Sequence, residues 1–402
     1  MKYFDTIIVG GGASGMMCAA MLSSRTKSEI LLIDRNDRLG KKLSATGNGQ
    51  GNISNAAMNV SHYFTTETSK VENILRCFDE KDLAHYLASL GGLLKTDEQG
   101  RIYPASMQAS SITDLFRFEL GRKKNVTVQL SSFVKKATQQ GDVFYIQTEN
   151  QEYSCKNLVI AAGGKAAKHF GTDGYAYTLA QSFSHSITAL LPALVQLKTP
   201  LDIIRGMKGI RVDCELSLYE AENFLKKVRG DIIFTDYGVS GNAVFKVSSF
   251  LTRNNHLILN FLPDISCSEF AKFLQKKLEH DPDIPAENLL CSIINNAVAR
   301  SLLKYCGIKG SAPFPLQRLN DVVSAVCGFP LLVSGTLGFD YAQVTKGGIP
   351  TEEVNENLMS KFCRNLYFTG EILNVDGECG GYNLQWAFSS AARVATAIVT
   401  EV

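Results

Sequence analysis

The hydrophobic pattern at the start of the chain predicts a strand, a tight turn and a helix. Residues Asp5 to Val9 form a short apolar, β-branched run that stops at Gly10-Gly11-Gly12, and an Ala-, Met- and Leu-rich segment follows from Ala13 to Ser23. A second apolar run, Ile30 to Ile33, ends at Asp34. Together these elements predict a βαβ unit, the building block of an α/β fold with a doubly wound parallel sheet.

Further strand patterns follow in the middle of the chain. The runs Val126 to Leu130, Val143 to Thr148 and Glu152 to Cys155 predict a small antiparallel meander. Leu158 to Ala162 is a continuous apolar run closed by Gly163-Gly164, which is typical of a strand buried on both faces. We therefore expect this last run to join the parallel sheet.

From about Pro192 the pattern changes to short alternating strands joined by Gly- and Asn-bearing turns, which predicts an inserted antiparallel β domain. Helical spacing over Ser268 to His280 and Glu287 to Tyr305 then predicts a helical subdomain. From Ala342 onward the sequence pattern again resembles that of the first domain, and it ends in an apolar helix, Tyr382 to Val399. The expected boundaries are 1–191 and 342–402 for the doubly wound domain, 192–265 and 331–341 for the β-rich insert, and 266–330 for the helical subdomain.

Composition supports a multidomain globular protein. The chain has 402 residues, of which 45% are hydrophobic and 20% charged, enough apolar material for more than one full core. The 41 Lys and Arg residues are nearly balanced by 39 Asp and Glu, for a formal charge of +2. So small an excess gives little attraction to a phosphate backbone, and we expect no nucleic-acid partner.

Cysteine and histidine usage predicts neither a metal centre nor a disulfide framework. The ten cysteines contain no C-x-x-C pair, and the six histidines show no i,i+4 pairing. The first residues lack the features of a signal peptide, and no apolar run reaches the roughly 18 residues that span a bilayer. We therefore expect a cytoplasmic protein without a membrane segment.

The first candidate site is the string Gly10-Gly11-Gly12-Ala13-Ser14-Gly15, which contains G-x-G-x-x-G. The string follows a predicted strand and opens a predicted helix, and Asp34 ends the next strand, which is the context of a dinucleotide site. Gly10 permits the turn, Gly12 lets the backbone approach a pyrophosphate, and Gly15 lets helix pack on strand. The free N–H groups of the helix start would bind the phosphates, and Asp34 would accept hydrogen bonds from a ribose.

The motif alone does not separate NAD from FAD, but three other features favour FAD. The βαβ unit opens the chain, a meander precedes Leu158 as in flavoproteins of the two-dinucleotide-binding type, and Thr369-Gly370-Glu371 follows the last predicted strand. Gly380-Gly381 opens the final helix, whose N–H groups and dipole could contact the pyrimidine edge of a flavin.

Beyond these patterns, the chain resembles the YhiN-like three-domain bacterial FAD flavoproteins, whose described members include aminoacetone oxidase and bile-acid enone reductases. The resemblance spans nearly the whole chain in family order. It rests on four blocks: Arg38 to Gly49 with Gly51-Asn52 and Asn55, Gly230 to Gly241, Gln343 to Gly348, and Gly370 to Gln385. It implies an FAD-binding doubly wound domain interrupted by a β-rich domain that carries a helical one.

The resemblance also implies which residues contact FAD. The glycine-rich turn and Asp34 would hold the ADP half, the loop from Lys42 to Asn48 would line the pyrophosphate and flavin, and the last block would close on the isoalloxazine. The backbone of Val134 would bond the adenine. The candidate cofactor-binding residues are Gly10, Gly12, Ala13, Ser14, Gly15, Asp34, Arg35, Lys42, Thr46, Gly47, Asn48, Val134, Ala162, Gly163, Gly370, Glu371, Gly381, Tyr382, Asn383 and Leu384.

One departure from the family pattern bears on the substrate. The family commonly has Arg-Cys after the second glycine of the loop, where this chain has Gln50-Gly51. A cation and a thiol are therefore missing from a loop expected near the flavin, so a substrate anion met there by arginine in relatives need not be the substrate here.

Since the flavin itself transfers hydride, the protein need only position a substrate and supply a proton. Tyr237 is the candidate proton donor, although tyrosine also serves as a packing residue. Cys379 could approach the flavin ring as a redox thiol, but no second cysteine is near it in sequence, which favours a loop role.

The sequence thus predicts an FAD-dependent oxidoreductase acting on a small organic substrate, with NAD(P)H visiting the flavin transiently because no second G-x-G-x-x-G is present. The first hypothesis is the reduction of an activated C=C bond. A flavin amine oxidase of the aminoacetone type that produces peroxide is the alternative. A flavoprotein of the tRNA-modification type is a further one, against which the lack of a basic, aromatic-studded stripe argues. The sequence leaves the oligomeric state open.

Overall fold

The structure is a computed structural model that describes residues 1–400. The chain forms two compact units, one made of residues 1–192 together with the segment from Gln343 onward, and one made of Ala193–Ala342. We call them unit 1 and unit 2. The finer division of the insert at residues 265 and 330 stays a prediction.

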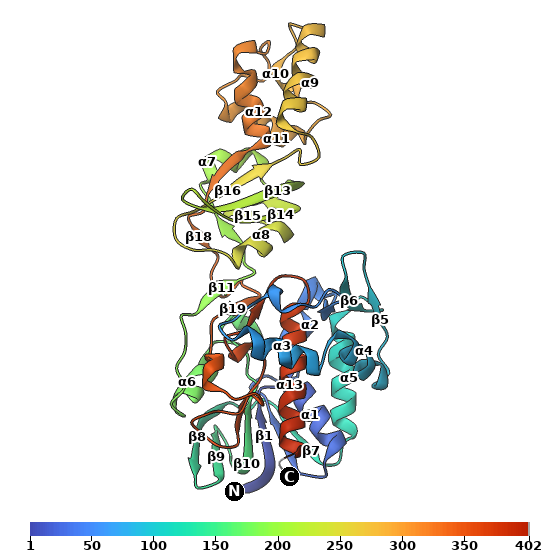
Figure 1. Cartoon of the computed structure of the whole chain (residues 1–402), viewed down its shortest axis with the longest axis vertical. Helices are drawn as coiled ribbons and strands as arrows, with labels where there is room; N and C mark the ends of the chain where they lie inside the picture. The colour runs from blue at the N-terminus through green and yellow to red at the C-terminus, as the bar shows by residue number, and fades with distance from the viewer. Residues whose placement is uncertain (401–402) are drawn as a thin grey trace. The chain divides into compact units, whose positions relative to one another are not determined.

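Unit 1 is built on a seven-stranded sheet. The strands β2, β1 and β10 are parallel neighbours, β7 lies parallel to β2, and β20 lies parallel to β10, whereas β9 and β8 continue the sheet antiparallel. This is the doubly wound α/β sheet that the opening βαβ pattern predicts (Figure 1). The strands are β1 (Lys2–Val9), β2 (Ile30–Ile33), β7 (Val126–Gln129), β8 (Val134–Gln140), β9 (Val143–Thr148), β10 (Glu152–Ile160) and β20 (Leu366–Phe368).

Two details of the predicted sheet are wrong. The run Val126 to Leu130 is no meander strand, because β7 pairs in parallel with β2. The runs expected as two strands, Glu152 to Cys155 and Leu158 to Ala162, belong to the single strand β10, which ends at Ile160. This strand stays in register with β1 from Tyr153 to Ile160, so its first part serves the meander and its second part the parallel sheet.

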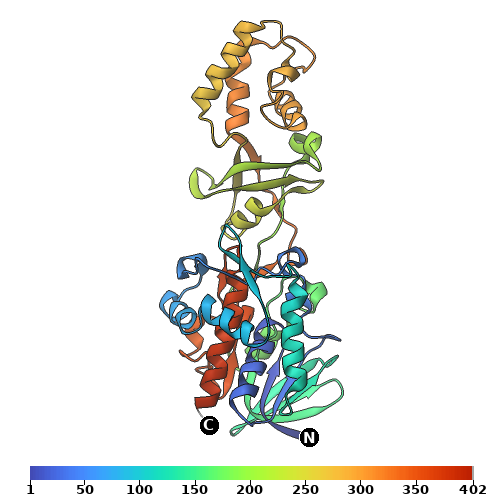
Figure 2. The same ribbon diagram turned by 90° about the vertical axis from the view of Figure 1, so that its right-hand side faces the viewer.

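Helices α1, α5 and α13 lie alongside one another on the sheet of unit 1 (Figures 1 and 2). Helix α1 packs on β1, β2, α5 and α13, and it is therefore buried from Ser14 to Ser23, with no polar face. That is why its sequence is so uniformly apolar. The helices of unit 1 are α1 (Ala13–Arg25), α2 (Lys41–Ser44), α3 (Thr68–Cys77), α4 (Glu80–Ser89), α5 (Ala109–Arg122), α6 (Tyr175–Gln181) and α13 (Tyr382–Thr400).

Smaller strand pairs bring distant segments of the chain together. A three-stranded sheet has the order β3, β6 and β5, β21 pairs with β4, and β11 pairs with β19. Short 3-10 turns, among them η1 (Thr46–Gly49) and η7 (Gly370–Ile372), complete the loops between them. The strands are β3 (Ser54–Asn55), β4 (Tyr63–Phe64), β5 (Leu94–Thr96), β6 (Arg101–Pro104), β11 (Leu191–Ala193), β19 (Val344–Lys346) and β21 (Asp376–Gly377).

Unit 2 is an antiparallel sheet with helices. Its strand order is β17, β16, β13, β14, β15, β12 and β18, and its long hairpin joins β13 to β14. Sheet residues such as Leu216 and helix residues such as Phe270 and Leu302 share one hydrophobic cluster. The elements are β12 (Leu197–Lys198), α7 (Leu201–Ile204), β13 (Arg211–Glu220), β14 (Asn223–Phe234), β15 (Gly238–Ser240), α8 (Asn242–Ser248), β16 (Asn255–Asn260), α9 (Cys267–His280), α10 (Ala286–Leu289), α11 (Asn296–Tyr305), α12 (Leu319–Cys327), β17 (Phe329–Leu332) and β18 (Gly335–Thr336).

Candidate functional site

The start of α1 has the geometry of a phosphate site. Gly10 has φ +108°, and a Cβ there would lie 2.5 Å from the carbonyl oxygen of Ala161. A Cβ on Gly15 would lie 1.8 Å from the carbonyl oxygen of Gly10. Gly12, the N-cap residue, has an ordinary φ of −80°, and its Cβ would meet nothing within 4 Å. Packing therefore requires glycine at 10 and 15, whereas at Gly12 the absence of a side chain leaves open space before the helix start, as a pyrophosphate needs.

Asp34 ties this turn to the end of β2. One carboxylate oxygen accepts from the backbone N–H of Gly11 at 2.6 Å, and the other accepts from the N–H of Asn36 at 2.7 Å. Burial raises the pKa of Asp34, and these hydrogen bonds oppose the rise. Each oxygen keeps a lone pair for a further donor, so the carboxylate can hold the turn and still accept a hydrogen bond from a ribose hydroxyl.

The expected adenine end lies beside Asp34. The N–H of Ser132 donates to the carbonyl of Asp34 at 2.9 Å, which places the segment leading to Val134 next to the end of β2. Arg35 pairs with Asp173 at 2.7 Å, and its guanidinium lies 4.8 Å from the ring centre of Phe133. The adenine contact of Val134 stays a prediction.

The start of α13 is seated on the segment around β3. A Cβ on Gly381, whose φ is +99°, would lie 2.2 Å from the carbonyl oxygen of Ser54. The side-chain amide of Asn55 donates to the carbonyl of Gly380 at 3.0 Å, and the hydroxyl of Tyr63 donates to the carbonyl of Tyr382 at 2.8 Å. These contacts fix where the first N–H groups of α13 point.

Asn383 and Leu384 follow in the first turn of α13. The side-chain oxygen of Asn383 accepts from the N–H of Gly377 at 2.8 Å, and its nitrogen donates to the carbonyl of Gly377 at 2.7 Å. Asn383 thus braces the loop before the helix through its side chain. Leu384 is half-buried and packs against the core of unit 1.

The loop from Thr46 to Asn48 leads to Asn52, which contacts the same helix start. Gly47 and Asn48 have φ values of +57° and +54°, a left-handed run that suits glycine and asparagine. The side-chain amide of Asn52 has one orientation in which both its nitrogen and its oxygen are hydrogen-bonded. In this orientation the nitrogen donates to the carbonyl of Ser54 at 2.9 Å, and the oxygen accepts from the N–H of Gly381 at 3.1 Å. The hydroxyl of Thr46 donates to the carbonyl of Leu43 at 2.7 Å, which fixes the entry into the loop.

An ion pair joins two other predicted residues that are 329 positions apart. The ammonium of Lys42 lies 2.7 Å from a carboxylate oxygen of Glu371. The second oxygen of Glu371 accepts from the N–H of Thr345 at 2.8 Å, and the Thr345 hydroxyl accepts from the N–H of Ala166 at 2.9 Å. Both charged side chains are about a fifth exposed, so the pair is reachable by a ligand.

The last block also reaches the start of α1. A Cβ on Gly370 would lie 2.7 Å from the hydroxyl oxygen of Ser14, and a Cβ on Gly163 would lie 3.7 Å from a carboxylate oxygen of Glu371. Ala162, which precedes Gly163 at the end of β10, packs against the hydrophobic core of unit 1. The structure therefore brings the two helix starts, the Lys42 loop and the end of β10 into one region of unit 1.

Sequence reasoning missed Asp376 and Thr345 as site residues. Asp376 is only 2% exposed, and neither carboxylate oxygen has a hydrogen-bond partner among residues 1–400. Burial raises its pKa to about 7; Lys346 opposes the rise and Glu371 adds to it. Both missed residues lie inside blocks that carried the family resemblance, and a lone carboxylate in the run Leu-Asn-Val-Asp-Gly was the available signal.

Tyr237, the candidate proton donor, lies in unit 2, in the turn between β14 and β15. Its side chain is half-buried, and its backbone N–H donates to the hydroxyl of Thr235 at 3.4 Å. A proton-donor role for Tyr237 stays a prediction.

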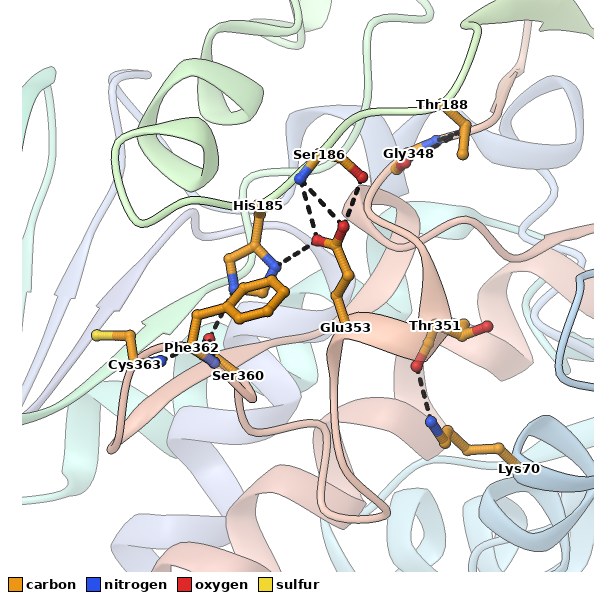
Figure 3. A network of polar contacts seen from close by, with 10 residues as sticks. All are labelled: Lys70, His185, Ser186, Thr188, Gly348, Thr351, Glu353, Ser360, Phe362 and Cys363. Atoms are coloured by element: carbon orange, nitrogen blue, oxygen red, sulfur yellow. Dashed lines mark hydrogen bonds and ion pairs between the residues drawn. The ribbon is translucent and has the colours of Figure 1, made fainter.

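A second polar cluster in unit 1 has the outline of a hydrolase triad (Figure 3). One ring nitrogen of His185 lies 2.9 Å from Glu353, and the other lies 2.7 Å from the hydroxyl of Ser360. However, the Ser360 oxygen already accepts from the N–H groups of Phe362 and Cys363, and it is 4% exposed. Burial lowers the pKa of His185. The serine is inaccessible and satisfied, so the cluster ties the chain together rather than attacking a substrate.

Between residues 1 and 400 no helix is long and apolar enough to cross a membrane. Over the same range no three His, Cys, Asp or Glu side chains gather as a metal site.

Comparison with known proteins now gives the class and the family. Residues 4–397 match the family described as HI0933-like protein Rossmann domain. The doubly wound fold, the two glycine-opened helix starts, this match and a full-length relative named as a reductase together support the class of FAD-dependent oxidoreductases. The chain belongs to the HI0933-like family, which confirms the family resemblance of the sequence blocks.

Relatives and solved structures of full length are similar to the chain. A 3-dehydro-bile acid delta(4,6)-reductase of Clostridium scindens is 34% identical over 95% of this chain and 96% of its own length. A ribosomal RNA dihydrouridine synthase of Escherichia coli is 29% identical over 97% of each. The structure of 3-ketosteroid delta1-dehydrogenase from Sterolibacterium denitrificans shares the fold, with 12% identity, full coverage of both chains and a TM-score of 0.54.

Proposed function

We propose that the protein is an FAD-dependent reductase that uses NADH or NADPH to saturate a carbon–carbon double bond conjugated to a carbonyl group in a small organic substrate. The observation that carries this proposal is the 34% identity, over nearly the whole of both chains, to a reductase named for bile-acid double bonds. When bound, the flavin supplies hydride transfer at its N5 atom.

In this proposal the residues of unit 1 bind and orient the cofactor. The open space at Gly12 and the N–H groups that start α1 hold the pyrophosphate, and Asp34 accepts from the ribose. The N–H groups at the start of α13 would hold the flavin ring, and the dipole of this helix would stabilise negative charge there. The ion pair between Lys42 and Glu371 joins α2 to η7, near the two helix starts.

The electron donor is a nicotinamide nucleotide that binds transiently. The chain has no second G-x-G-x-x-G, so a dedicated nicotinamide domain is not expected. A donor that visits the flavin and leaves makes room for the substrate in the same space, and reduction and substrate turnover would then alternate.

A uracil base in ribosomal RNA is the second candidate substrate. The observation in its favour is the 29% identity to a ribosomal RNA dihydrouridine synthase over 97% of the chain. Dihydrouridine forms when hydrogen adds across a double bond conjugated to a carbonyl, so the two relatives' names describe the same kind of bond change. The near balance of charge, +2 overall, favours the small substrate.

One anaerobic experiment separates these functions. We expect NADH or NADPH to bleach the yellow holoprotein, and a 3-keto steroid with a conjugated double bond to restore the colour without oxygen. Recovery with ribosomal RNA that lacks dihydrouridine, and not with the steroid, would select the RNA substrate. Bleaching by aminoacetone, followed by peroxide release in air, would select the amine oxidase. A holoprotein that neither nicotinamide bleaches would contradict the proposal.

A further inference from the structure

Asp376 is a buried acidic residue of unit 1 whose carboxylate has no hydrogen-bond donor in the described part of the chain. It lies in β21, where its Cα partner in β4 is Phe64, and its side chain is 2% exposed. Burying a carboxylate without partners is costly, so the group must hold a proton or receive a partner that the protein does not supply.

The groups that face Asp376 leave it poised between its two charge states. From β19 comes the cation Lys346, whose ammonium lies 4.6 Å from the ring centre of Phe64. From η7 comes the anion Glu371, which Lys42 already pairs.

The other two elements packed against β21 bring neutral groups. These groups are the phenols of Tyr63 in β4 and Tyr382 in α13. Burial raises the pKa of each phenol above its ordinary value, so both stay neutral near pH 7. The hydroxyl of Tyr63 is used on the carbonyl of Tyr382. One cation and one anion therefore set the balance at Asp376.

The position of Asp376 ties it to the cofactor site. It follows Glu371 by five residues in the same block, and a Cβ on its neighbour Gly377 would lie 2.7 Å from the Tyr382 side chain at the start of α13. Because the carboxyl group of Asp376 is buried, solvent would screen it only weakly from charge added to a cofactor that η7 and α13 hold.

We propose that Asp376 is the proton store of the flavin site: it takes one proton from solvent when the bound cofactor gains two electrons and releases it when the electrons leave. Negative charge gained nearby raises the pKa of a carboxyl group, which is the driving force for uptake. The proposal rests on the proposed function for its substrate step.

The substrate step balances as follows. A reduced nicotinamide gives a hydride, two electrons and one proton, to the cofactor, and the Asp376 carboxylate takes a second proton from water. The hydride then forms a C–H bond at one alkene carbon as the π bond breaks. The proton released by Asp376 balances the C–H bond at the other carbon, and Asp376 returns to its carboxylate form.

The test is a redox titration of the purified holoprotein across pH, with a mediator dye and dithionite, so neither substrate nor nicotinamide is needed. For a two-electron couple the midpoint potential falls by about 30 mV per pH unit for each proton taken up. We expect the wild-type slope to steepen from one proton to two as pH rises through the pKa of Asp376 in the oxidised holoprotein; the surroundings that the chain itself supplies raise this pKa to about 7. Asp376→Asn is expected to keep the one-proton slope throughout.

The slope of midpoint potential against pH changes at one pH, which we call the break. Whether the slope steepens or flattens there distinguishes proton loss from Asp376 from proton loss from the flavin ring. Loss of a proton from the reduced ring at N1 would make the slope shallower, not steeper, with rising pH. Asp142→Asn, an exposed carboxylate in the turn between β8 and β9, is the matched control and should keep the wild-type break. A wild-type slope without steepening, or steepening that persists in Asp376→Asn, would overturn the proposal.

A second variant keeps the test open if Asp376→Asn does not retain flavin. Lys346→Met removes the cation that favours the carboxylate, so the break should move to higher pH. An unmoved break would count against Asp376. Because the titration uses dithionite, these outcomes are independent of whether NADH or NADPH bleaches the protein, which tests the proposed function separately.

Discussion

Helices α1 and α13 pack against each other in unit 1, and both begin after glycines, but the two starts are built differently (Figure 1). The start of α1 is held by backbone from its own βαβ unit and from β10, and one of its glycines, Gly12, faces open space. The start of α13 is held by a distant segment, and a Cβ on Gly381 would collide with the carbonyl of Ser54. Glycine at 381 is therefore required by the protein itself, whereas at Gly12 the protein's own packing does not require it.

This difference separates two meanings of a glycine motif. A glycine whose Cβ would strike backbone is a folding residue, and its substitution changes stability with or without a cofactor. A glycine at a helix start that has an ordinary φ and whose Cβ would meet nothing, as at Gly12, is explained by a ligand, and its substitution should change binding alone. Substitutions at the two helix starts test this distinction.

The largest effect is expected from Gly381→Ala. The new methyl group would lie 2.2 Å from the carbonyl oxygen of Ser54, in a backbone conformation with φ +99°. Strain and overpacking each cost about 1–3 kcal/mol, so the loss of about 2–6 kcal/mol is comparable to a domain's whole stability. Thermal unfolding of the flavin-free protein measures it.

Gly141→Ala is the matched control for backbone strain. Gly141 also has positive φ, +60°, but its Cβ would meet nothing within 4 Å. We expect a loss of only about 1–2 kcal/mol from the left-handed conformation. Equal losses in the two variants would mean that the contact with Ser54 does not decide the residue at 381.

Gly12→Val is expected to abolish flavin retention while leaving the fold intact. The side chain would enter the space before α1, where the Cβ would meet no atom of a more distant residue within 4 Å, and would exclude a pyrophosphate. We expect the dissociation constant for FAD to rise at least about 100-fold, or about 3 kcal/mol. Absorbance of the purified protein and titration with FAD measure the loss.

The flavin-free forms provide the control for this variant. Since Gly12 has an ordinary φ of −80°, flavin-free Gly12→Val should unfold at the same temperature as the flavin-free wild type. Gly12→Ala should weaken binding to a smaller extent. A yellow Gly12→Val protein would place the pyrophosphate elsewhere.

The same contrast explains how much of the fold was predictable. The opening βαβ unit follows from a short stretch of sequence, because each apolar run and each glycine acts on its immediate neighbours. The parallel pairing of β7 was missed because four residues of the pattern Val-Thr-Val-Gln carry no information on the direction of a partner strand. The single strand β10 was missed because the polar residues Lys156 and Asn157 interrupt its apolar pattern.

The site divides in the same way. The turn at Gly10 to Gly15 and its partner Asp34 could be read from spacing alone, and the structure joins them through a 2.6 Å hydrogen bond. The burial of Asp376 and the contact of His185 with Glu353 could not, because they depend on segments that meet only in the folded chain. The family resemblance pointed to the block from Gly370 to Gln385, but it did not single out Asp376 within that block.

The smallest effect is expected from Lys42→Met, which tests whether the two helix starts act together. Lys42 neutralises Glu371 at 2.7 Å, and Glu371 adjoins Gly370, whose Cβ would touch Ser14 at the start of α1. Without the ammonium, the Glu371 carboxylate would repel a nearby phosphate, although partial exposure screens the effect. We expect the dissociation constant for FAD to rise about tenfold, or about 1.4 kcal/mol.

Lys41→Met is the matched control, because the neighbouring lysine pairs with the exposed carboxylate of Asp37 at 2.8 Å. Its effect on FAD binding should stay below about twofold, since exposed pairs contribute little. Adding Glu371→Gln to Lys42→Met should recover part of the lost affinity, because it removes the unpaired negative charge. If Lys41→Met and Lys42→Met weaken binding equally, the loss reflects general charge, and the ion pair does not couple the two helix starts.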